Sequence, residues 1–484
     1  DYPLAAQMYQ DLVDRWPEDS HIGDALFNAA SLQLELKDAR TARQLLQRLS
    51  DDFPDQAARP RARFLAGRVL LQQKKPDAAR DAFIKVSQNE QAQPRSIALS
   101  LYYIAKIDHN RKQYDSALQA VQRLQPMLND EANRDLRGAL ALGAMSAIEQ
   151  KEFQTAEQRA TAYLQDSTSD DQKTDALAAR TVAYAHQERY EQALQDADTL
   201  IESAANSEQT WSAVLQAAEH AWEKTQYQPA LQLFQRATID QAPQATQLSA
   251  SSGVAWSLFR MERFTDAATA FQTTADSWPE TSPGFEARYM IARCQQEAGQ
   301  PDEAIEQYAI ISKEFAERLS TTEDPDLKEQ LKTYALDAGR TAARMLAKAE
   351  RIEQANQQWK TLTALFSDAD ELDVLLDEWA VLNLRHERYD LADDIYRRLL
   401  QERPDSRFAG YARYSLAESD FMARRFDRAI SEFEAIIQND SYDADPRARA
   451  MFKLIDIHSA RGNWKHVDAL TRRFASDHSD DSLA

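Results

Sequence analysis

Side chains that could perform catalysis or bind a metal are few in this sequence and lie far apart. The 484 residues include eight histidines and a single cysteine, Cys294. There is no HExxH pair, glycine-rich phosphate loop or nucleophile elbow. His458 and His466 are eight residues apart, and this spacing favours a surface histidine pair over a metal site. We therefore expect no catalytic residue, cofactor-binding residue or metal ligand.

Composition narrows the possible partners and the fold class. The chain has 78 acidic and 57 basic residues, a net charge of −21, whereas nucleic-acid binding needs a basic surface. No stretch approaches 18 consecutive apolar residues, so we expect no membrane span in this segment. Only 10 residues are glycine, and strong helix formers dominate. These features predict an all-helical protein that does not bind nucleic acid.

An internal repeat positions every other feature of the chain. An alanine, in most copies followed four residues later by a large apolar residue, recurs at intervals of 37 to 39 residues, with one interval of 51. These anchor positions are Ala5, Ala42, Ala79, Ala117, Ala156, Ala193, Ala230, Ala267, Ala304, Ala355, Ala392, Ala429 and, with valine instead of alanine, Val467. So steady a period is the signature of a repeat architecture.

Three further positions keep the same register. Twelve residues before the anchor, a small residue occurs in ten of twelve repeats, as at Gly67 and Ala255. An aromatic residue is common three residues before the anchor, and a proline often follows it by twelve residues, as Phe264 and Pro279 do around Ala267. We expect two amphipathic helices per repeat, with the small residues where the helix axes approach most closely. A larger side chain there would overpack the contact, at a cost of about 1–3 kcal/mol.

This pattern resembles the tetratricopeptide repeat family over essentially the whole chain. The resemblance implies an all-α fold, a right-handed α-solenoid of about 12–13 helix–turn–helix repeats with a period of about 37 residues. Phrases such as WPETSPGFEARYMIARC also resemble bacterial cell-envelope members, of the kind found with the Tol–Pal and outer-membrane assembly machineries. That likeness favours the periplasm or cell envelope over the cytoplasm.

The organisation we expect has three parts. Residues 1–317 form repeats, of which the first is incomplete; residues 318–333 are an insertion; residues 334–484 continue the repeats. The incomplete first repeat indicates a segment of a longer protein. The insertion is predicted to extend two helices into a hairpin, with a loop as the alternative. Alanines at 160 and 197 predict a softer joint, unless Tyr163 and Tyr184 compensate for them.

The resemblance implies that the first helix of each repeat lines a concave groove. The repeat frame places two clusters on that face. The first is basic and aromatic: Arg61, Phe64, Arg68, Tyr102 and Lys106. The second is an aromatic strip followed by arginines: Trp222, Trp256, Phe259, Tyr289, Arg293, Arg340 and Arg344. Aromatic residues and arginine are enriched at interface centres, and arginine can bind a carboxylate with two hydrogen bonds. The alternative is that these aromatic residues only pack between repeats.

The function we expect is a non-enzymatic scaffold or adaptor. It would bind a peptide or protein in the groove, within a bacterial envelope or secretion assembly. The alternative is a helical regulatory or targeting arm of a larger enzyme, transporter or regulator. Self-assembly through the ends of the solenoid is a third possibility, and the sequence leaves the oligomeric state open.

Overall fold

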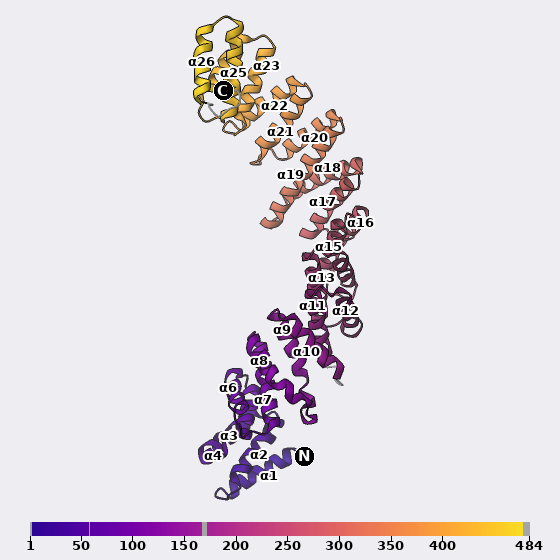
Figure 1. Cartoon of the computed structure of the whole chain (residues 1–484), viewed down its shortest axis with the longest axis vertical. Helices are drawn as coiled ribbons and strands as arrows, with labels where there is room; N and C mark the ends of the chain where they lie inside the picture. The colour runs from indigo at the N-terminus through magenta and orange to yellow at the C-terminus, as the bar shows by residue number, and fades with distance from the viewer. Residues whose placement is uncertain (1, 58, 167–171, 478–484) are drawn as a thin grey trace. The chain divides into compact units, whose positions relative to one another are not determined.

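The computed structural model describes residues 2–57, 59–166 and 172–477, and within these ranges the chain forms helices and no strands. The helices group into two compact units, unit 1 (Asp1–Arg263) and unit 2 (Phe264–Ala484). Figure 1 shows the helices of each unit following one another in chain order.

Unit 1 contains mostly long helices joined by short turns. Its helices are α1 (Tyr2–Arg15), α2 (Ile22–Glu35), α3 (Ala39–Asp52), α4 (Pro54–Ala57), α5 (Pro60–Gln72), α6 (Pro76–Ser87), α7 (Pro94–Asn110), α8 (Tyr114–Leu124), the 3₁₀ helices η1 (Gln125–Asn129) and η2 (Glu131–Leu136), α9 (Gly138–Glu149), α10 (Phe153–Asp166), α11 (Lys173–His186), α12 (Tyr190–Ala204), α13 (Glu208–Glu223), α14 (Tyr227–Arg236) and α15 (Gln244–Arg260).

Unit 2 follows the same alternation of helices. Its helices are α16 (Phe264–Ser277), α17 (Ser282–Glu297), α18 (Pro301–Arg318), α19 (Pro325–Lys348), α20 (Ile352–Leu365), α21 (Leu372–Arg385), α22 (Tyr389–Glu402), α23 (Ala409–Met422), α24 (Phe426–Gln438), α25 (Ala444–Ala460) and α26 (Trp464–Asp477).

Within each unit, a first helix packs against the second helix of its own repeat and against the second helix before it, as α13 does with α14 and α12, and α21 with α22 and α20. The predicted contact positions lie inside this packing. The anchor alanines from Ala42 to Ala429 are all 0% exposed. The small residues twelve positions earlier are buried as well, Gly67 included. The predicted all-α fold of stacked helix pairs is thus confirmed.

One turn joins the two helices of each repeat. Five residues before each anchor from Ala42 to Val467, the backbone is left-handed, as at Lys112 with φ of 60°. The Lys112 amide donates to the His109 carbonyl at 2.9 Å, and the Gln113 amide donates to the Asp108 carbonyl at 2.8 Å. These bonds form a Schellman motif, which usually has glycine at the left-handed position. Here only two such positions, Gly299 and Gly462, are glycine.

The repeats predicted to be soft are filled by tyrosines. Ala160 and Ala197 are 0% exposed. Tyr163 is buried in the same apolar cluster as Ala160, and Tyr184 in the same cluster as Ala197. Each tyrosine therefore adds apolar surface to the cluster that contains one of the alanines, and the softer joint stays a prediction.

The long interval between Ala304 and Ala355 is occupied by the two longest helices, α18 with 18 residues and α19 with 24. Asp324 caps α19 by accepting hydrogen bonds from the amides of Asp326 and Leu327. Phe315 and Leu331 are fully buried in the main apolar cluster of unit 2. Both helices therefore pack into this cluster through residues close to the insertion. The division of the chain at residues 317 and 333 stays a prediction.

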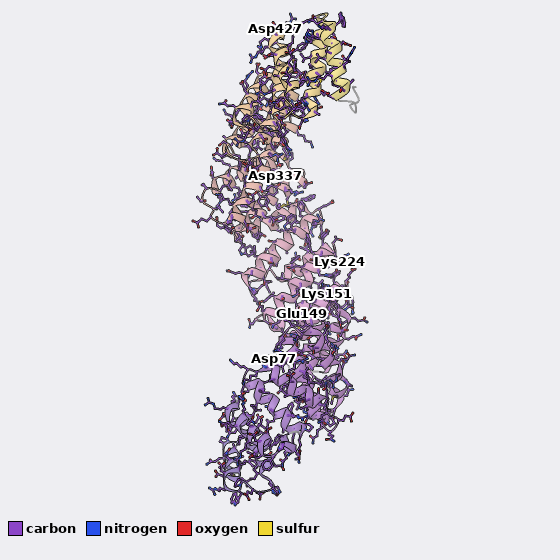
Figure 2. All side chains as sticks on the ribbon, turned by 90° about the vertical axis from the view of Figure 1, so that its left-hand side faces the viewer. Asp77, Glu149, Lys151, Lys224, Asp337 and Asp427 are labelled. Carbon is purple, nitrogen blue, oxygen red and sulfur yellow. The ribbon has the colours of Figure 1, made fainter. Side chains whose placement is uncertain are left out.

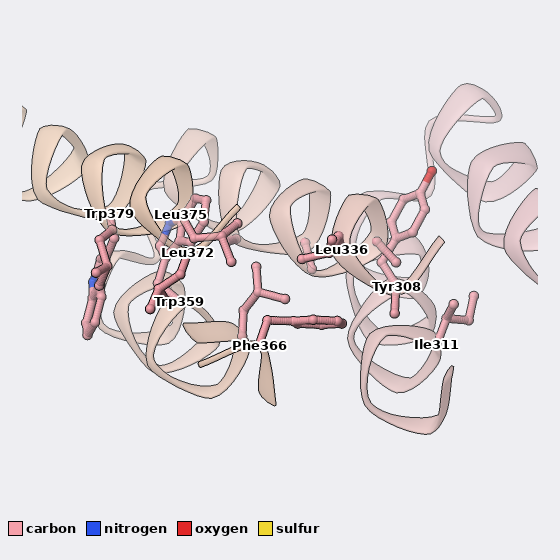
Figure 3. Packing of buried hydrophobic residues seen from close by; sticks show 14 of the residues in the cluster. Tyr308, Ile311, Leu336, Trp359, Phe366, Leu372, Leu375 and Trp379 are labelled. Atoms are coloured by element: carbon pink, nitrogen blue, oxygen red, sulfur yellow. The ribbon is translucent and has the colours of Figure 1, made fainter. Parts of the chain in front are cut away.

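The core of unit 2 runs between successive helix pairs. Figure 3 shows Trp359, Phe366 and Leu372 gathered in this core, with Tyr308 and Leu336 further along it. Trp359 is 2% exposed and Leu372 is 0% exposed. Among the described residues, none of the helices combines the length and apolar character that crossing a bilayer requires.

Candidate protein-binding face

The first helices of unit 1 lie beside one another. Helix α9 contacts α11, α11 contacts α13, and α13 contacts α15. In unit 2, α17 contacts α19 and α23 contacts α25. These helices form the first-helix face of each unit, and the predicted groove positions lie on it. Two pockets on this face have the same place in the repeat.

The aromatic pocket lies between α13 and α15 in unit 1 and has a volume of about 410 Å³. Two tryptophans line it, Trp222 from α13 and Trp256 from α15. Its remaining lining residues are Glu219, Glu223, Phe234, Ser252, Gly253 and Arg260. Because a tryptophan combines a large apolar surface with one hydrogen-bond donor, this lining suits a side chain with an apolar stem and a polar end.

The depth of the aromatic pocket depends on one glycine. Gly253 faces the ring of Phe234, and a Cβ atom built on it would lie 2.6 Å from the ring carbons Cδ1 and Cε1. That distance is well inside van der Waals contact. Any other residue would therefore displace Phe234 or fill the space above it. Phe234 itself is only 5% exposed, because most of its ring packs in the apolar core.

The polar groups of the aromatic pocket are only partly satisfied within the chain. Burial and the neighbouring Glu223 carboxylate raise the pKa of Glu219. The indole Nε1 of Trp222 is buried without a hydrogen-bond acceptor among the described residues. Arg260 instead donates from Nε to the Tyr227 hydroxyl at 3.2 Å, and its guanidinium lies 5.5 Å from the centre of that ring.

The charged pocket lies between α19 and α21 in unit 2 and has a volume of about 530 Å³. Trp359 is its buried aromatic residue, as Phe234 is in the aromatic pocket. Cationic side chains surround it: Arg344 and Lys348 from α19, and Arg385 from α21. Its other lining residues are Ala347, Asp377, Glu378, Val381, Leu382 and His386.

Two carboxylates sit among these cations. Glu378 accepts hydrogen bonds from both Arg340 and Arg344, the latter at 2.8 Å. Asp377 accepts a hydrogen bond from the Tyr396 hydroxyl at 3.4 Å. Burial raises the pKa of Asp377 to about 6, and Glu378 adds to the rise. Positive charge thus prevails at the rim formed by Arg344, Lys348 and Arg385.

The arginines of the first predicted cluster pair with acidic residues of a neighbouring repeat. Arg61 forms an ion pair with Asp24, and Arg68 forms one with Glu35 at 3.0 Å. Each of these arginines therefore ties its own repeat to the one before it. Lys106 is exposed.

The aromatic members of that cluster pack against other aromatic rings. Phe64 contacts Phe83 of its own repeat, with ring centres 5.6 Å apart, and Tyr103 of the next repeat at 6.1 Å. Tyr102 contacts Tyr103, its neighbour on α7, at 5.9 Å. Tyr103 stacks on Phe83 at 5.0 Å. It therefore fills the space above Phe83 that corresponds to the open space above Phe234 in the aromatic pocket. The packing alternative weighed for these aromatic residues therefore applies to this part of the chain.

The second predicted cluster divides between the units. In unit 1, Trp222 and Trp256 meet in the aromatic pocket, and Phe259 contacts Trp256 with ring centres 5.7 Å apart. In unit 2, Tyr289 on α17 stacks on Tyr334 at 4.8 Å and donates a hydrogen bond to Asp337.

The arginines of the second cluster belong to unit 2. Arg293 lies on α17, and its charge reaches Tyr289, where it opposes the rise of that residue's pKa. Arg340 and Arg344 share Glu378, so a bound carboxylate would compete with Glu378 for them.

Two features escaped the sequence-based prediction. The first is a set of pocket residues seven positions before an anchor: Glu223, Arg260, Lys348 and Arg385. Arg260 and Lys348 lie four residues after the predicted groove positions Trp256 and Arg344, on the same helix face. Extending the frame by one helical turn would have found them. The second feature is a stack of His186 between Phe153 at 3.9 Å and His220 at 3.8 Å.

The stacked rings come from successive repeats. Phe153 and His186 are 33 positions apart in the sequence, and His186 and His220 are 34 positions apart. Burial, His220, Lys151 and Lys224 together lower the pKa of His186 to about 4. Both lysines are marked in Figure 2. Burial also lowers the pKa of His220, and its Nε2 is a further buried atom without a partner in the described part of the chain. Both rings are therefore neutral near pH 7.

The remaining candidates for chemistry are buried. The predicted surface pair is wrong for His458, which is only 7% exposed because α25 packs that ring inward, against His466 at 4.9 Å. Burial raises the pKa of Cys294 to about 12, so its thiol is protonated at neutral pH. Within residues 2–57, 59–166 and 172–477, no group of three or more histidine, cysteine or acidic side chains could hold a metal ion.

Comparison with known proteins gives the class of the repeats. Models of the tetratricopeptide repeat match residues 24–55, 253–315 and 378–444. These three segments are similar to tetratricopeptide repeats, which are typically protein-interaction modules. No curated protein matches the sequence significantly.

Several solved structures are similar to this chain. They include the Naa15/Naa10 complex bound to HypK (13% identity, TM-score 0.38, covering 95% of this chain and 69% of the other), a tetratricopeptide repeat protein from Parabacteroides merdae (15%, 0.32, 57% and 98%) and the APC/C hetero-tetramer Cut9–Hcn1 (14%, 0.27, 100% and 91%).

Proposed function

We propose that this chain is a non-enzymatic scaffold that binds a segment of a partner protein on its first-helix face. The observation that carries the proposal is the recurrence of one pocket type. The aromatic and charged pockets both lie between successive first helices, above a buried aromatic residue four positions after an anchor alanine. Their lining residues differ in charge and size, as expected where individual pockets select individual side chains of a partner.

The physical basis is that interface energy concentrates at a few buried anchors. Tryptophan and arginine are enriched among such anchors, and a side chain that fills a desolvated pocket contributes most of the affinity. Trp222, Trp256 and Arg344 stand at pocket walls rather than in the core. Burying one apolar side chain there contributes about 1.5–3 kcal/mol.

The test is affinity capture with the full chain from extracts of the source organism. Trp222→Ala/Trp256→Ala should lose a protein that the wild-type chain captures, and Lys348→Glu/Arg385→Glu should weaken its capture. Trp16→Ala/Trp464→Ala is the matched control, because both of its tryptophans are more than half exposed, at 57% and 67%. Capture that both pocket variants leave unchanged, with circular dichroism showing intact helices, would contradict the proposal.

We further propose that the scaffold works in a bacterial envelope or secretion assembly, in the periplasm. The support is the resemblance of its linker phrases to cell-envelope members of the repeat family. Cell fractionation with an antibody to the chain tests this placement. Recovery in the cytoplasmic fraction alone would contradict it.

A further inference from the structure

The aromatic pocket has a lining whose charge and ring faces fit one kind of side chain. We propose that it binds an arginine of the partner segment. This inference rests on the proposed function, since it names the residue that the first-helix face of unit 1 recognises.

The rings provide the first part of the recognition. Trp222 and Trp256 stand on neighbouring helices, and Phe234 lies beneath Gly253. A guanidinium placed over an indole ring gains a cation–π attraction, and tryptophan is the strongest aromatic partner for it. The planar, weakly hydrated guanidinium can stack on such a ring at a lower desolvation cost than an ammonium group.

The carboxylates provide the second part. Glu219 and Glu223 lie four residues apart on α13, so both project from the same side of that helix. Each can accept two hydrogen bonds from a guanidinium. The raised pKa of Glu219 reflects partial burial beside another carboxylate rather than beside a cation.

The cation already at this site is engaged elsewhere. Arg260, the one basic residue among the described lining residues, bonds to the Tyr227 hydroxyl and lies over the Tyr227 ring. Two carboxylates therefore face a single cation that has its own partner. An acidic side chain entering the pocket would be repelled, and a neutral one would leave both carboxylates without new hydrogen bonds.

The charged pocket shows that this lining is not a general property of the repeat. At the equivalent positions of α19 and α21, Arg344, Lys348 and Arg385 replace Glu219, Glu223 and Arg260. Two of three positions thus carry opposite charge. Arginine selectivity is expected at the aromatic pocket and not at the charged pocket.

The experiment is fluorine NMR of the full chain labelled with fluorotryptophan, with the signals of the two pocket residues assigned from Trp222→Phe and Trp256→Phe. N-acetyl-arginine amide is titrated as the probe. N-acetyl-citrulline amide, a neutral molecule of almost the same shape, and N-acetyl-glutamate amide are the controls. We expect saturable shifts of these two signals with the arginine probe, affinity weaker by about tenfold for citrulline, and no shift with glutamate.

Charge variants complete the test. Glu219→Gln/Glu223→Gln should weaken arginine binding by about fivefold to tenfold. Glu191→Gln/Glu202→Gln, which removes the same charge from exposed positions of α12, should leave it unchanged. Equal affinity for arginine and citrulline, or no saturable shift at millimolar probe, would overturn the inference. If Trp222→Ala/Trp256→Ala nevertheless abolished capture of a partner, the scaffold proposal would stand without it.

Discussion

The aromatic pocket and the charged pocket are built from the same positions of the repeat and differ in what they present. Both have a buried ring four residues after the anchor, Phe234 after Ala230 and Trp359 after Ala355. Both are walled by first helices, α13 and α15 in one unit, α19 and α21 in the other. The buried ring and the two first helices thus determine where a pocket lies, and the residues around its rim determine what it can bind.

A third repeat pair shows what closes such a pocket. Fourteen residues before the anchor, the chain has Tyr103, Gly253 and Glu378 in three different repeats. Tyr103 stacks on Phe83 and fills the space, Gly253 leaves it open, and Glu378 holds two arginines at its edge. The residue at this position therefore decides whether the space above the buried ring is closed or open, and the rim residues decide its charge.

The largest predicted effect comes from removing the buried ring. Phe234→Ala and Trp359→Ala should each lower the free energy of unfolding of their unit by about 3–5 kcal/mol, because both rings are almost fully buried. Urea unfolding followed by hydrogen exchange of peptides from each unit measures this loss. A cost below about 1 kcal/mol for either variant would show that the two rings are not equivalent supports.

The next prediction concerns Gly253. Gly253→Ala should destabilise unit 1 by about 1–3 kcal/mol, because the new Cβ would collide with Phe234. Its counterpart, Glu378→Ala, removes a partly exposed ion-pair partner and should cost at most about 1 kcal/mol. Thermal unfolding of the two variants compares them. Equal costs would contradict the role assigned to the glycine.

The histidine stack gives unit 1 a dependence on acidity. The pKa of His186 is lower in the folded chain, about 4, than its ordinary 6.5. The neutral His186 ring therefore contributes fully to the free energy of unfolding above about pH 6.5, and this contribution falls as the pH drops toward 4. The loss is at most about 3 kcal/mol. It is smaller than this limit because the ring is partly exposed to solvent. His186→Phe should reduce the slope of melting temperature against pH, whereas His21→Phe, at an exposed site, should not.

Asp377 gives the charged pocket the opposite dependence. Its pKa is raised to about 6 from 3.8, so the folded state holds its proton more tightly than the unfolded state. Stability should increase as the pH falls from about 6 to about 4. Asp377→Asn should raise the melting temperature at neutral pH and remove this increase. A lower melting temperature for that variant at neutral pH would contradict the burial cost.

The smallest effect tests what the two units share. Lys112 and Glu387 both have left-handed backbones, with φ of 60° and 58°. Lys112→Gly and Glu387→Gly should each stabilise the chain by about 0.5–1 kcal/mol, because glycine adopts this conformation without strain. Lys106→Gly, inside α7, should instead destabilise by about 1 kcal/mol. Destabilisation by all three variants would show that the turns are unstrained.

The repeat made much of the fold predictable from the sequence. Small residues at a fixed distance from each anchor predicted the helix pairs and the buried contacts, including Ala218 and Ala230, both 0% exposed. The left-handed turns were not predictable, because lysine, glutamate, threonine and arginine occupy positions where glycine is usual.

The candidate site was predicted in part. Trp222, Trp256 and Arg344 line pockets as groove positions, because helix periodicity determines which side chains share a face. Arg61 and Arg68 could not be judged from their own repeat, since their partners Asp24 and Glu35 lie in the previous one. Pocket volume also depends on whether a neighbouring ring fills the space, as Tyr103 does.

The central claim, that a partner binds on the first-helix face, is tested most directly by site-specific photo-crosslinking. Benzoylphenylalanine replaces Ser252, which lines the aromatic pocket, or Gln235, which is exposed on the second helix α14. We predict that a partner protein crosslinks from position 252 and not from position 235. Crosslinking from position 235 with none from position 252 would contradict the account.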